Sequence, residues 1–154
     1  KKMKAVLQRV QYAKVSVSQQ VVGKIDKGLL IFLGVQQGDT MEDLDYLVKK
    51  IALMRIFSDE NGKMNLSCLD VNGDFLVVSQ FTLLANTHKG NRPSYIESAA
   101  PDIAKKMYED FTNSLAQFTQ KNIQNGIFGA DMQIELLNDG PVTILLDSRN
   151  KSLT

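Results

Sequence analysis

The chain has a single cysteine, Cys68, a single histidine, His88, and no tryptophan. One cysteine cannot close a disulfide within the chain, and one cysteine with one histidine is too few for a zinc site built from these ligands. Proteins without disulfides are typical of reducing compartments. We therefore expect a cytoplasmic protein without a zinc site of this kind.

Long apolar runs and an excess of one charge are also missing. The longest strongly apolar run, residues 29–35, is far shorter than the roughly 20 residues that span a membrane, and no signal-type segment follows the first residues. The 18 basic and 17 acidic residues give a net charge of +1, so an anionic partner must be met by local clusters of charge. We expect a soluble protein with no membrane partner.

What the chain does have is enough apolar material for one compact domain. Its 154 residues are 44% hydrophobic, and a chain of this length buries roughly 70% of its unfolded surface on folding. We expect a single domain over residues 1–154, with Lys1-Lys2, ahead of Met3, as a candidate remnant of cloning.

Hydrophobic periodicity predicts an alternation of strands and helices. Alternating or continuous apolar runs predict strands at residues 5–10, 14–18, 21–25, 29–33, 132–137 and 142–146. Helical spacing predicts two amphipathic helices, one with the apolar residues Leu44, Leu47, Val48 and Ile51, and one that starts near Pro101 with the stripe Ile103, Met107, Phe111 and Leu115. Asn61-Gly62 and Asn72-Gly73 predict hairpin turns. This order favours an α+β fold with an antiparallel or mixed sheet.

Residues 75–84 stand out as an apolar run that also contains Ser79, Gln80 and Thr82. We interpret the run as a largely buried strand with polar groups at one end. In a regular strand Gln80 and Thr82 would share one face, and Ser79 and Phe81 the other. A buried polar group without a partner costs on the order of 1–3 kcal/mol. The three groups therefore indicate either a satisfied structural network or a site that faces a ligand.

Most familiar catalytic motifs are absent from the sequence. It contains no phosphate-binding loop of the Walker type, no GxGxxG and no HExxH. A Ser-His-Asp triad would have to use His88, which lies beside Lys89 in a polar segment, and Cys68 lies in an apolar setting typical of an inert buried thiol. Hydroxyls, amides, basic side chains and main-chain donors remain, a set suited to polarising an ester or carbonyl.

The sequence closely resembles the D-aminoacyl-tRNA deacylase family from Met3 to about Asp147. Several motifs carry the resemblance: Val6-Leu7-Gln8-Arg9-Val10, Lys63-Met64-Asn65-Leu66-Ser67, Ser79-Gln80-Phe81-Thr82-Leu83, Lys89-Gly90 with Arg92-Pro93-Ser94, Phe128-Gly129-Ala130-Asp131-Met132 and Asn138-Asp139-Gly140-Pro141-Val142-Thr143. The family fold is α+β, with antiparallel and mixed sheets that form a partly open barrel-like core and two main helices.

The resemblance implies a homodimer that hydrolyses the ester between a D-amino acid or glycine and the 3′-terminal adenosine of tRNA, without a metal or other cofactor. This activity is chiral proofreading, which recycles mischarged tRNA. In the family the segment from Ser79 to Leu83 lines the pocket, and a cis Gly140-Pro141 from the partner subunit enters that pocket to select the hand of the amino acid.

Two mechanisms are consistent with these residues. The N–H groups of Phe81 and Thr82 can hold a developing oxyanion while the ribose 2′-hydroxyl assists attack by water. Alternatively Thr82 is a nucleophile, although no adjacent base is evident in the sequence. The first alternative is favoured.

Other candidate site residues have weaker assignments. Arg9 either braces the Gly140-Pro141 segment or forms a surface ion pair, and Met132 and Phe128 are equally consistent with pocket wall and ordinary core. Lys89, Arg92 and Ser94 are candidates for contact with tRNA. A nucleic-acid-binding module without hydrolysis and an esterase for small molecules remain competing functions, and the near-neutral charge disfavours strong binding to a duplex.

Overall fold

The computed structural model describes residues 3–149, so Lys1-Lys2 lie outside the described residues. The strands are β1 (Lys4–Val17), β2 (Gln20–Ile25), β3 (Gly28–Gly34), β4 (Phe57–Ser58), β5 (Met64–Leu66), β6 (Asp74–Ser79), β7 (Gln124–Asn125) and β8 (Met132–Asp147). The helices are α1 (Met41–Leu53), α2 (Pro101–Thr119) and a short 3-10 turn, η1 (Phe81–Leu84). Neither long helix within residues 3–149 is apolar enough to cross a membrane.

The main sheet is mixed and winds almost into a barrel. Its order is β2-β1-β3-β6-β7, and β8 pairs along the other side of β1. The ladders of β1 with β2, β3 and β8 are antiparallel, whereas β3–β6 and β6–β7 are parallel. The two ends of this strand order, β2 and β7, approach each other at a seam, where the N–H of Lys24 in β2 donates to Oε1 of Gln124 in β7 at 3.4 Å. The predicted α+β fold with a partly open barrel-like core and two main helices is confirmed.

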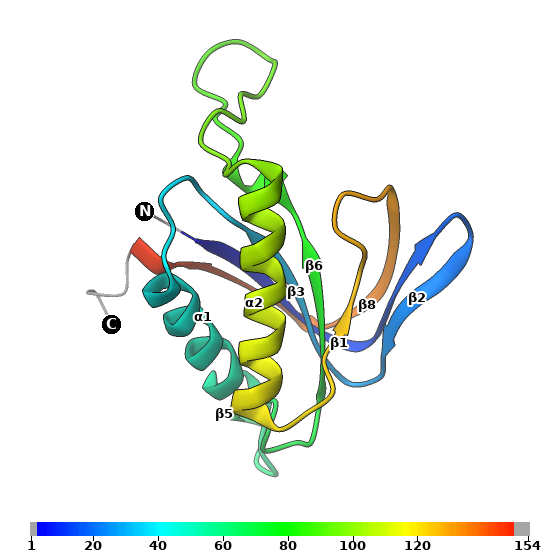
Figure 1. The fold of residues 1–154 in the computed structure, drawn as a ribbon. Helices are drawn as coiled ribbons and strands as arrows, with labels where there is room; N and C mark the ends of the chain where they lie inside the picture. The colour runs from blue at the N-terminus through cyan, green and yellow to red at the C-terminus, as the bar shows by residue number, and fades with distance from the viewer. Residues whose placement is uncertain (1–2, 150–154) are drawn as a thin grey trace.

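The two helices lie together on one face of the sheet (Figure 1). The larger buried cluster lies between that face and the helices, and its fully buried side chains include Leu7, Ile31, Phe75 and Phe111. A smaller cluster, with Val15, Leu30, Leu76 and Val78 among its members, lies on the opposite face. Both faces of β3 and β6 are therefore covered, as expected for parallel strands in the middle of a sheet.

The first predicted pair of strands is one strand. Residues 5–10 and 14–18 were predicted separately, but β1 runs unbroken from Lys4 to Val17. Its first half pairs with β3 and its second half with β2, while β8 runs along both halves and holds them in line. Register shifts near Val10 break the alternation that the sequence pattern relies on. The two predicted strands at 132–137 and 142–146 are likewise the two halves of β8.

The prediction of a strand over residues 75–84 is wrong beyond Ser79. The chain turns at Gln80 into η1, so Gln80 and Thr82 do not share a strand face. The reason lies in Gly34, at the end of β3: a Cβ there would come within 2.6 Å of Leu84 Cδ2 and 3.1 Å of Leu83 Cβ. The missing side chain lets Leu84 pack down in a turn, where it is buried, while Phe81 stays 58% exposed.

Two smaller predictions need correction. Asn61-Gly62 does turn the β4–β5 hairpin, but Asn72-Gly73 leads into β6, which pairs in parallel with β3, so it closes no hairpin. Helix α2 begins at Pro101 as predicted, but Ile103 is 56% exposed. The buried stripe instead includes Tyr108 beside Met107, Phe111 and Leu115. Residues 107, 108, 111 and 115 follow helical spacing as well as the predicted set does, which is why the sequence could not separate them.

Candidate active site

The candidate site lies where two parallel strands end at the same edge of the sheet. Leu33 of β3 stands beside Ser79 of β6 in the parallel ladder. The N–H of Gln80 donates to the Leu33 carbonyl at 2.8 Å, and the chain then enters η1. Side chains at the ends of these strands therefore face the space between η1 and the start of α2.

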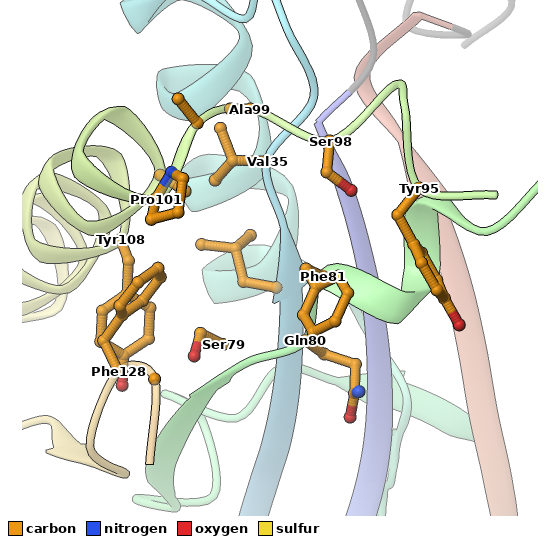
Figure 2. Close-up of a pocket in the computed structure, with 14 residues that line it drawn as sticks. Val35, Ser79, Gln80, Phe81, Tyr95, Ser98, Ala99, Pro101, Tyr108 and Phe128 are labelled. Atoms are coloured by element: carbon orange, nitrogen blue, oxygen red, sulfur yellow. The ribbon is translucent and has the colours of Figure 1, made fainter.

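That space is a pocket of about 480 Å³. Its walls come from the ends of β3 and β6, the segment before α2, the first turns of α2 and the loop after β7 (Figure 2). The lining residues are Leu33, Val35, Ser79, Gln80, Phe81, Tyr95, Ser98, Ala99, Ala100, Pro101, Ala104, Tyr108, Phe128 and Gly129. None of them carries a charge, so the pocket is suited to a neutral, flat or apolar group.

Aromatic rings stand on two sides of the pocket. Phe81 and Tyr95 meet edge to face, with ring centroids 5.0 Å apart. On the other side Tyr108 and Phe128 are tilted against each other at 6.0 Å. Figure 2 shows the two pairs on opposite sides of the opening. Such rings supply faces and edges on which a planar ligand can stack.

The phenol of Tyr108 is a fixed part of the wall. Its hydroxyl donates to the Val77 carbonyl at 2.9 Å and accepts from Asn125 Nδ2 at 3.1 Å. Burial raises the pKa of Tyr108 above its ordinary value. With its proton engaged and its ionisation disfavoured, this hydroxyl is positioned for structure and not for acid-base catalysis.

Two sets of polar groups at the pocket lack partners within the described chain. The Ser98 hydroxyl oxygen is buried and has no hydrogen-bond partner among residues 3–149. The N–H groups of Phe81 and Thr82 lie in the first turn of η1, where no acceptor exists within the turn, and neither donates elsewhere in residues 3–149. These donors and this hydroxyl are available to a ligand.

Thr82 stands beside the pocket and does not line it. Its side chain is exposed, and its Oγ1 accepts a hydrogen bond from Gln80 Nε2. Within residues 3–149 no lysine, histidine or carboxylate forms a hydrogen bond with the Thr82 hydroxyl. The choice between a nucleophilic Thr82 and main-chain stabilisation of the oxyanion stays a prediction.

Arg9 and the Gly140-Pro141 segment form a separate group. Arg9 Nε donates to the Asp139 carbonyl at 3.1 Å, and Arg9 Nη1 donates to the Ile56 carbonyl at 2.8 Å. Arg9 Nε also lies 3.6 Å from Asp139 Oδ2, and the side chain is only 11% exposed. Arg9 therefore contacts the Gly140-Pro141 segment at Asp139 and also forms an ion pair there, so its bracing role stays a prediction.

The Gly140-Pro141 peptide bond is cis, and both residues are exposed. Neither lines the pocket of its own chain. Their predicted role at the pocket of a partner subunit stays a prediction.

The other predicted residues fall into three places. Phe128 lines the pocket, whereas Met132 packs against the smaller core cluster, close to Gly126. Lys89, Arg92 and Ser94 lie in the exposed loop between Asn86 and Ser94, which is closed by an isolated bridge between its two ends. None of the three loop residues lines the pocket. Their contact with tRNA stays a prediction.

Sequence reasoning missed several wall residues, among them Tyr95, Ser98 and Tyr108. One signal was present: Ser98-Ala99-Ala100 ahead of Pro101 is a run of small residues before a helix start, which leaves room beside the helix. His88 is exposed in the loop, and Cys68 is fully buried, with its pKa raised to about 12 by burial. Within residues 3–149, no three His, Cys, Asp or Glu side chains could hold a metal ion together.

A nearly closed mixed sheet with an uncharged pocket at the ends of its parallel strands defines a small α+β protein whose site offers hydroxyls, amides and main-chain donors. The chain belongs to the D-aminoacyl-tRNA deacylase family. The family model described as D-Tyr-tRNA(Tyr) deacylase matches residues 6–147.

The curated relatives agree with this assignment, and two solved structures share the fold. The chain is 59% identical to a D-aminoacyl-tRNA deacylase of Thermosipho africanus, over 96% of this chain and 98% of the relative. It is 57% identical to one of Flavobacterium johnsoniae, over 97% and 99%. Among solved structures, the c-Myc DNA unwinding element binding protein has a TM-score of 0.87 at 39% identity, over 93% of this chain and 97% of that one.

A second solved structure, a probable eukaryotic D-amino acid tRNA deacylase, has a TM-score of 0.85 at 16% identity. It covers 96% of this chain and 100% of its own. At that identity the likeness concerns the fold alone.

Proposed function

We propose that the chain carries out its family's deacylase reaction in the cytoplasm with the pocket beside η1 as the active site. It hydrolyses the ester that joins a D-amino acid or glycine to the 3′-terminal adenosine of tRNA, and so serves chiral proofreading. The observation that carries this assignment is the uncharged, aromatic-walled pocket that ends at the unpartnered N–H groups of Phe81 and Thr82.

The pocket suits the adenine base of the terminal nucleotide. Its volume of about 480 Å³ is in the range of small-ligand sites. Adenine is flat and neutral and has several hydrogen-bonding atoms on its edge, which matches rings on two sides and the free hydroxyl of Ser98. A phosphate would find no cation in this wall.

With the base in the pocket, the ester lies near the start of η1. Water attacks the ester carbonyl, and the developing oxyanion accepts hydrogen bonds from the N–H groups of Phe81 and Thr82. The bond from the carbonyl carbon to the ribose oxygen then breaks, and that oxygen takes up the proton that the attacking water gives up, which leaves the free amino acid and the tRNA. The ribose 2′-hydroxyl assists the attack, because the pocket wall carries no histidine, lysine or carboxylate that could act as a base.

The hand of the amino acid is selected by the partner subunit in this proposal. Gly140 and Pro141 are exposed in their own chain, and Arg9 fixes the segment through the Asp139 carbonyl. In a homodimer this segment enters the partner's pocket and occupies the space that an L side chain needs. A D side chain points away from the segment, and glycine has no side chain to exclude. The Gly140-Pro141 segment therefore rejects L-aminoacyl esters but accepts D-aminoacyl and glycyl esters.

Lys89, Arg92 and Ser94 give the same substrate a second point of contact. Their loop is exposed and ends at Tyr95, which lines the pocket. Phosphate contacts of this kind position a nucleic acid without reading its sequence.

A second candidate is DNA binding, because the similar solved structure carries the name of a DNA unwinding element binding protein. The net charge of +1 disfavours this candidate, since duplex binding rests on several phosphate contacts.

The decisive experiment incubates the chain with D- and L-tyrosyl-tRNA and follows loss of the ester. Rapid loss of the D ester alone is expected. Stable D ester with tight duplex DNA binding would replace the proposal with the second candidate.

A further inference from the structure

The exposed side of α1 carries a groove that the proposed reaction does not use. The groove, here called the α1 groove, has a volume of about 540 Å³ and is lined by Tyr46, Lys49, Lys50, Leu53, Met54 and Arg55. Lys49 and Lys50 follow Tyr46 by three and four residues, and Leu53 follows them by four and three, so these four side chains share one face of the helix. The floor is apolar and the rim is basic.

The charge of the α1 groove is entirely positive. Lys49, Lys50 and Arg55 supply three cations, and no carboxylate lines the groove. None of the three forms an ion pair with a carboxylate in the described part of the chain. Since the whole chain has a net charge of only +1, this is a local concentration of positive charge that an anion can meet without competition.

Two of these cations are held in place by neighbours. Lys50 Nζ lies 5.5 Å from the centre of the Tyr46 ring, and Arg55 Nη1 donates to Asn65 Oδ1 at 3.2 Å. Both contacts leave further N–H donors for a ligand. Less side-chain freedom is lost on binding when the donors are already ordered.

The groove is joined to the Gly140-Pro141 segment by a single side chain. Arg55 precedes Ile56, whose carbonyl accepts from Arg9 Nη1 at 2.8 Å, and the same guanidinium donates to the Asp139 carbonyl at 3.1 Å. A segment that enters a partner's pocket therefore brings the α1 groove of its own subunit towards that pocket. This step rests on the proposed function.

We propose that the α1 groove binds the phosphodiester backbone of the aminoacyl-tRNA. In the dimer, the tRNA whose 3′ end occupies the pocket of one subunit is held by the α1 groove of the other. Three cations that form no ion pair within the described residues fit a polyanion, and Tyr46 and Leu53 give the sugar an apolar surface. The pocket itself offers no cation, so phosphates beyond the reach of Lys89 and Arg92 need a further site of this kind.

The test compares the double variant Lys49→Gln/Lys50→Gln with the parent on two substrates. With D-tyrosyl-tRNA the KM should rise, and the slope of its logarithm against the logarithm of salt concentration should fall by roughly 0.7–0.9 per lost contact. With the 3′ ester of D-tyrosine and adenosine, which has no phosphate, kcat/KM should stay unchanged. Lys105→Gln/Lys106→Gln on α2 removes the same charge and is the matched control.

The proposal is overturned if Lys49→Gln/Lys50→Gln keeps the parent's KM and salt slope. It is also overturned if the control variant shows an equal rise in KM and an equal fall in the salt slope. Binding of uncharged tRNA by the parent and both variants gives a readout that does not depend on hydrolysis. If the parent hydrolyses neither ester, the proposed function fails, yet a loss of tRNA binding confined to Lys49→Gln/Lys50→Gln would still support the groove. Loss of binding to phosphatidylserine vesicles with unchanged tRNA binding would reassign the groove to a membrane surface.

Discussion

The side chain of Thr82 has one visible role, which is to accept the hydrogen bond from Gln80 Nε2. Loss of one oxyanion-hole donor costs roughly 100- to 1,000-fold in kcat, and Thr82→Ala keeps its N–H. We therefore expect kcat for D-tyrosyl-tRNA to fall by clearly less than that, through a loosened Gln80, and Thr82→Ser to remain near the parent.

Single-turnover kinetics with quenching and mass spectrometry would check this. An inactive but folded Thr82→Ala protein, or an acyl group trapped on Thr82, would show that the hydroxyl is the nucleophile and would reverse the order of the two mechanisms.

Arg9 joins two main-chain carbonyls that are distant in sequence, those of Ile56 and Asp139. Arg9→Gln leaves at least one of them without its donor, at a cost of about 1–3 kcal/mol of stability. Because the Gly140-Pro141 segment loses its support, the rate on L-tyrosyl-tRNA should rise relative to that on the D ester. Arg9→Lys keeps the charge but not the planar set of donors, so its stability and its ratio of L to D rates should lie between those of the parent and of Arg9→Gln.

Thermal unfolding and the ratio of D to L rates measure the two effects separately. A destabilised variant with the parent's ratio would make Arg9 a purely structural residue.

Single residues also show where prediction from sequence ends. Cys68 could be assigned as a buried thiol because its neighbours Leu66 and Leu69 are apolar. Ser98 could not be found, since a serine in a loop has no periodic signal, and only the fold shows that its oxygen is buried beside the pocket without a partner.

At the scale of elements, the helices were predictable and the end of β6 was not. Capping, a first-turn proline and helical spacing are local signals, and both α1 and α2 follow them. The turn at Gln80 depends on a glycine 46 positions earlier in the chain, Gly34, against which η1 packs. No local pattern in residues 75–84 contains that information.

This contact gives a test of how the site is built. A Cβ at Gly34 would come within 3.1 Å of the Gln80 carbonyl oxygen and closer to Leu84, so Gly34→Ala should displace η1 and the N–H groups of Phe81 and Thr82. Activity should fall by about 100-fold or more, as when an oxyanion donor is lost.

Gly23→Ala is the matched control, because its Cβ would meet the carbonyl oxygen of Asn125 at the seam of the barrel. It should lower the melting temperature while kcat of the folded fraction stays close to the parent's. Equal losses of kcat in the two variants would contradict the role of η1 in placing the N–H groups of Phe81 and Thr82.

For the whole molecule, the buried thiol predicts sensitivity to alkali. In the folded chain Cys68 keeps its proton up to a pKa of about 12, against an ordinary value of 9.0. Between these values the unfolded chain binds fewer protons than the folded one, so stability falls as pH rises. Burial of Tyr108 raises its pKa and acts in the same direction.

Melting temperatures from pH 8 upward should therefore decline, and more gently in Cys68→Ala. An identical slope in that variant would mean that the thiol does not titrate on unfolding.

The fold class of the whole molecule followed from the order of the predicted elements. The barrel-like core was predicted only from the family resemblance, because strand register is set by contacts across the chain that no local pattern contains.

The ladder between β1 and β8 joins the beginning of the described chain to its end, with Lys4 opposite Asp147 and Val17 opposite Met132. Because the chain is synthesised from its N-terminus, β1 can pair with β8 only after nearly the whole chain has left the ribosome, although β2 and β3 are made much earlier. Arrested nascent chains that stop before β8 should stay sensitive to protease, and chains that include it should become resistant. Arg9 meets Asp139 only in that last step, so under the proposed function the segment that selects the D substrate gains its support when translation of this chain is almost finished.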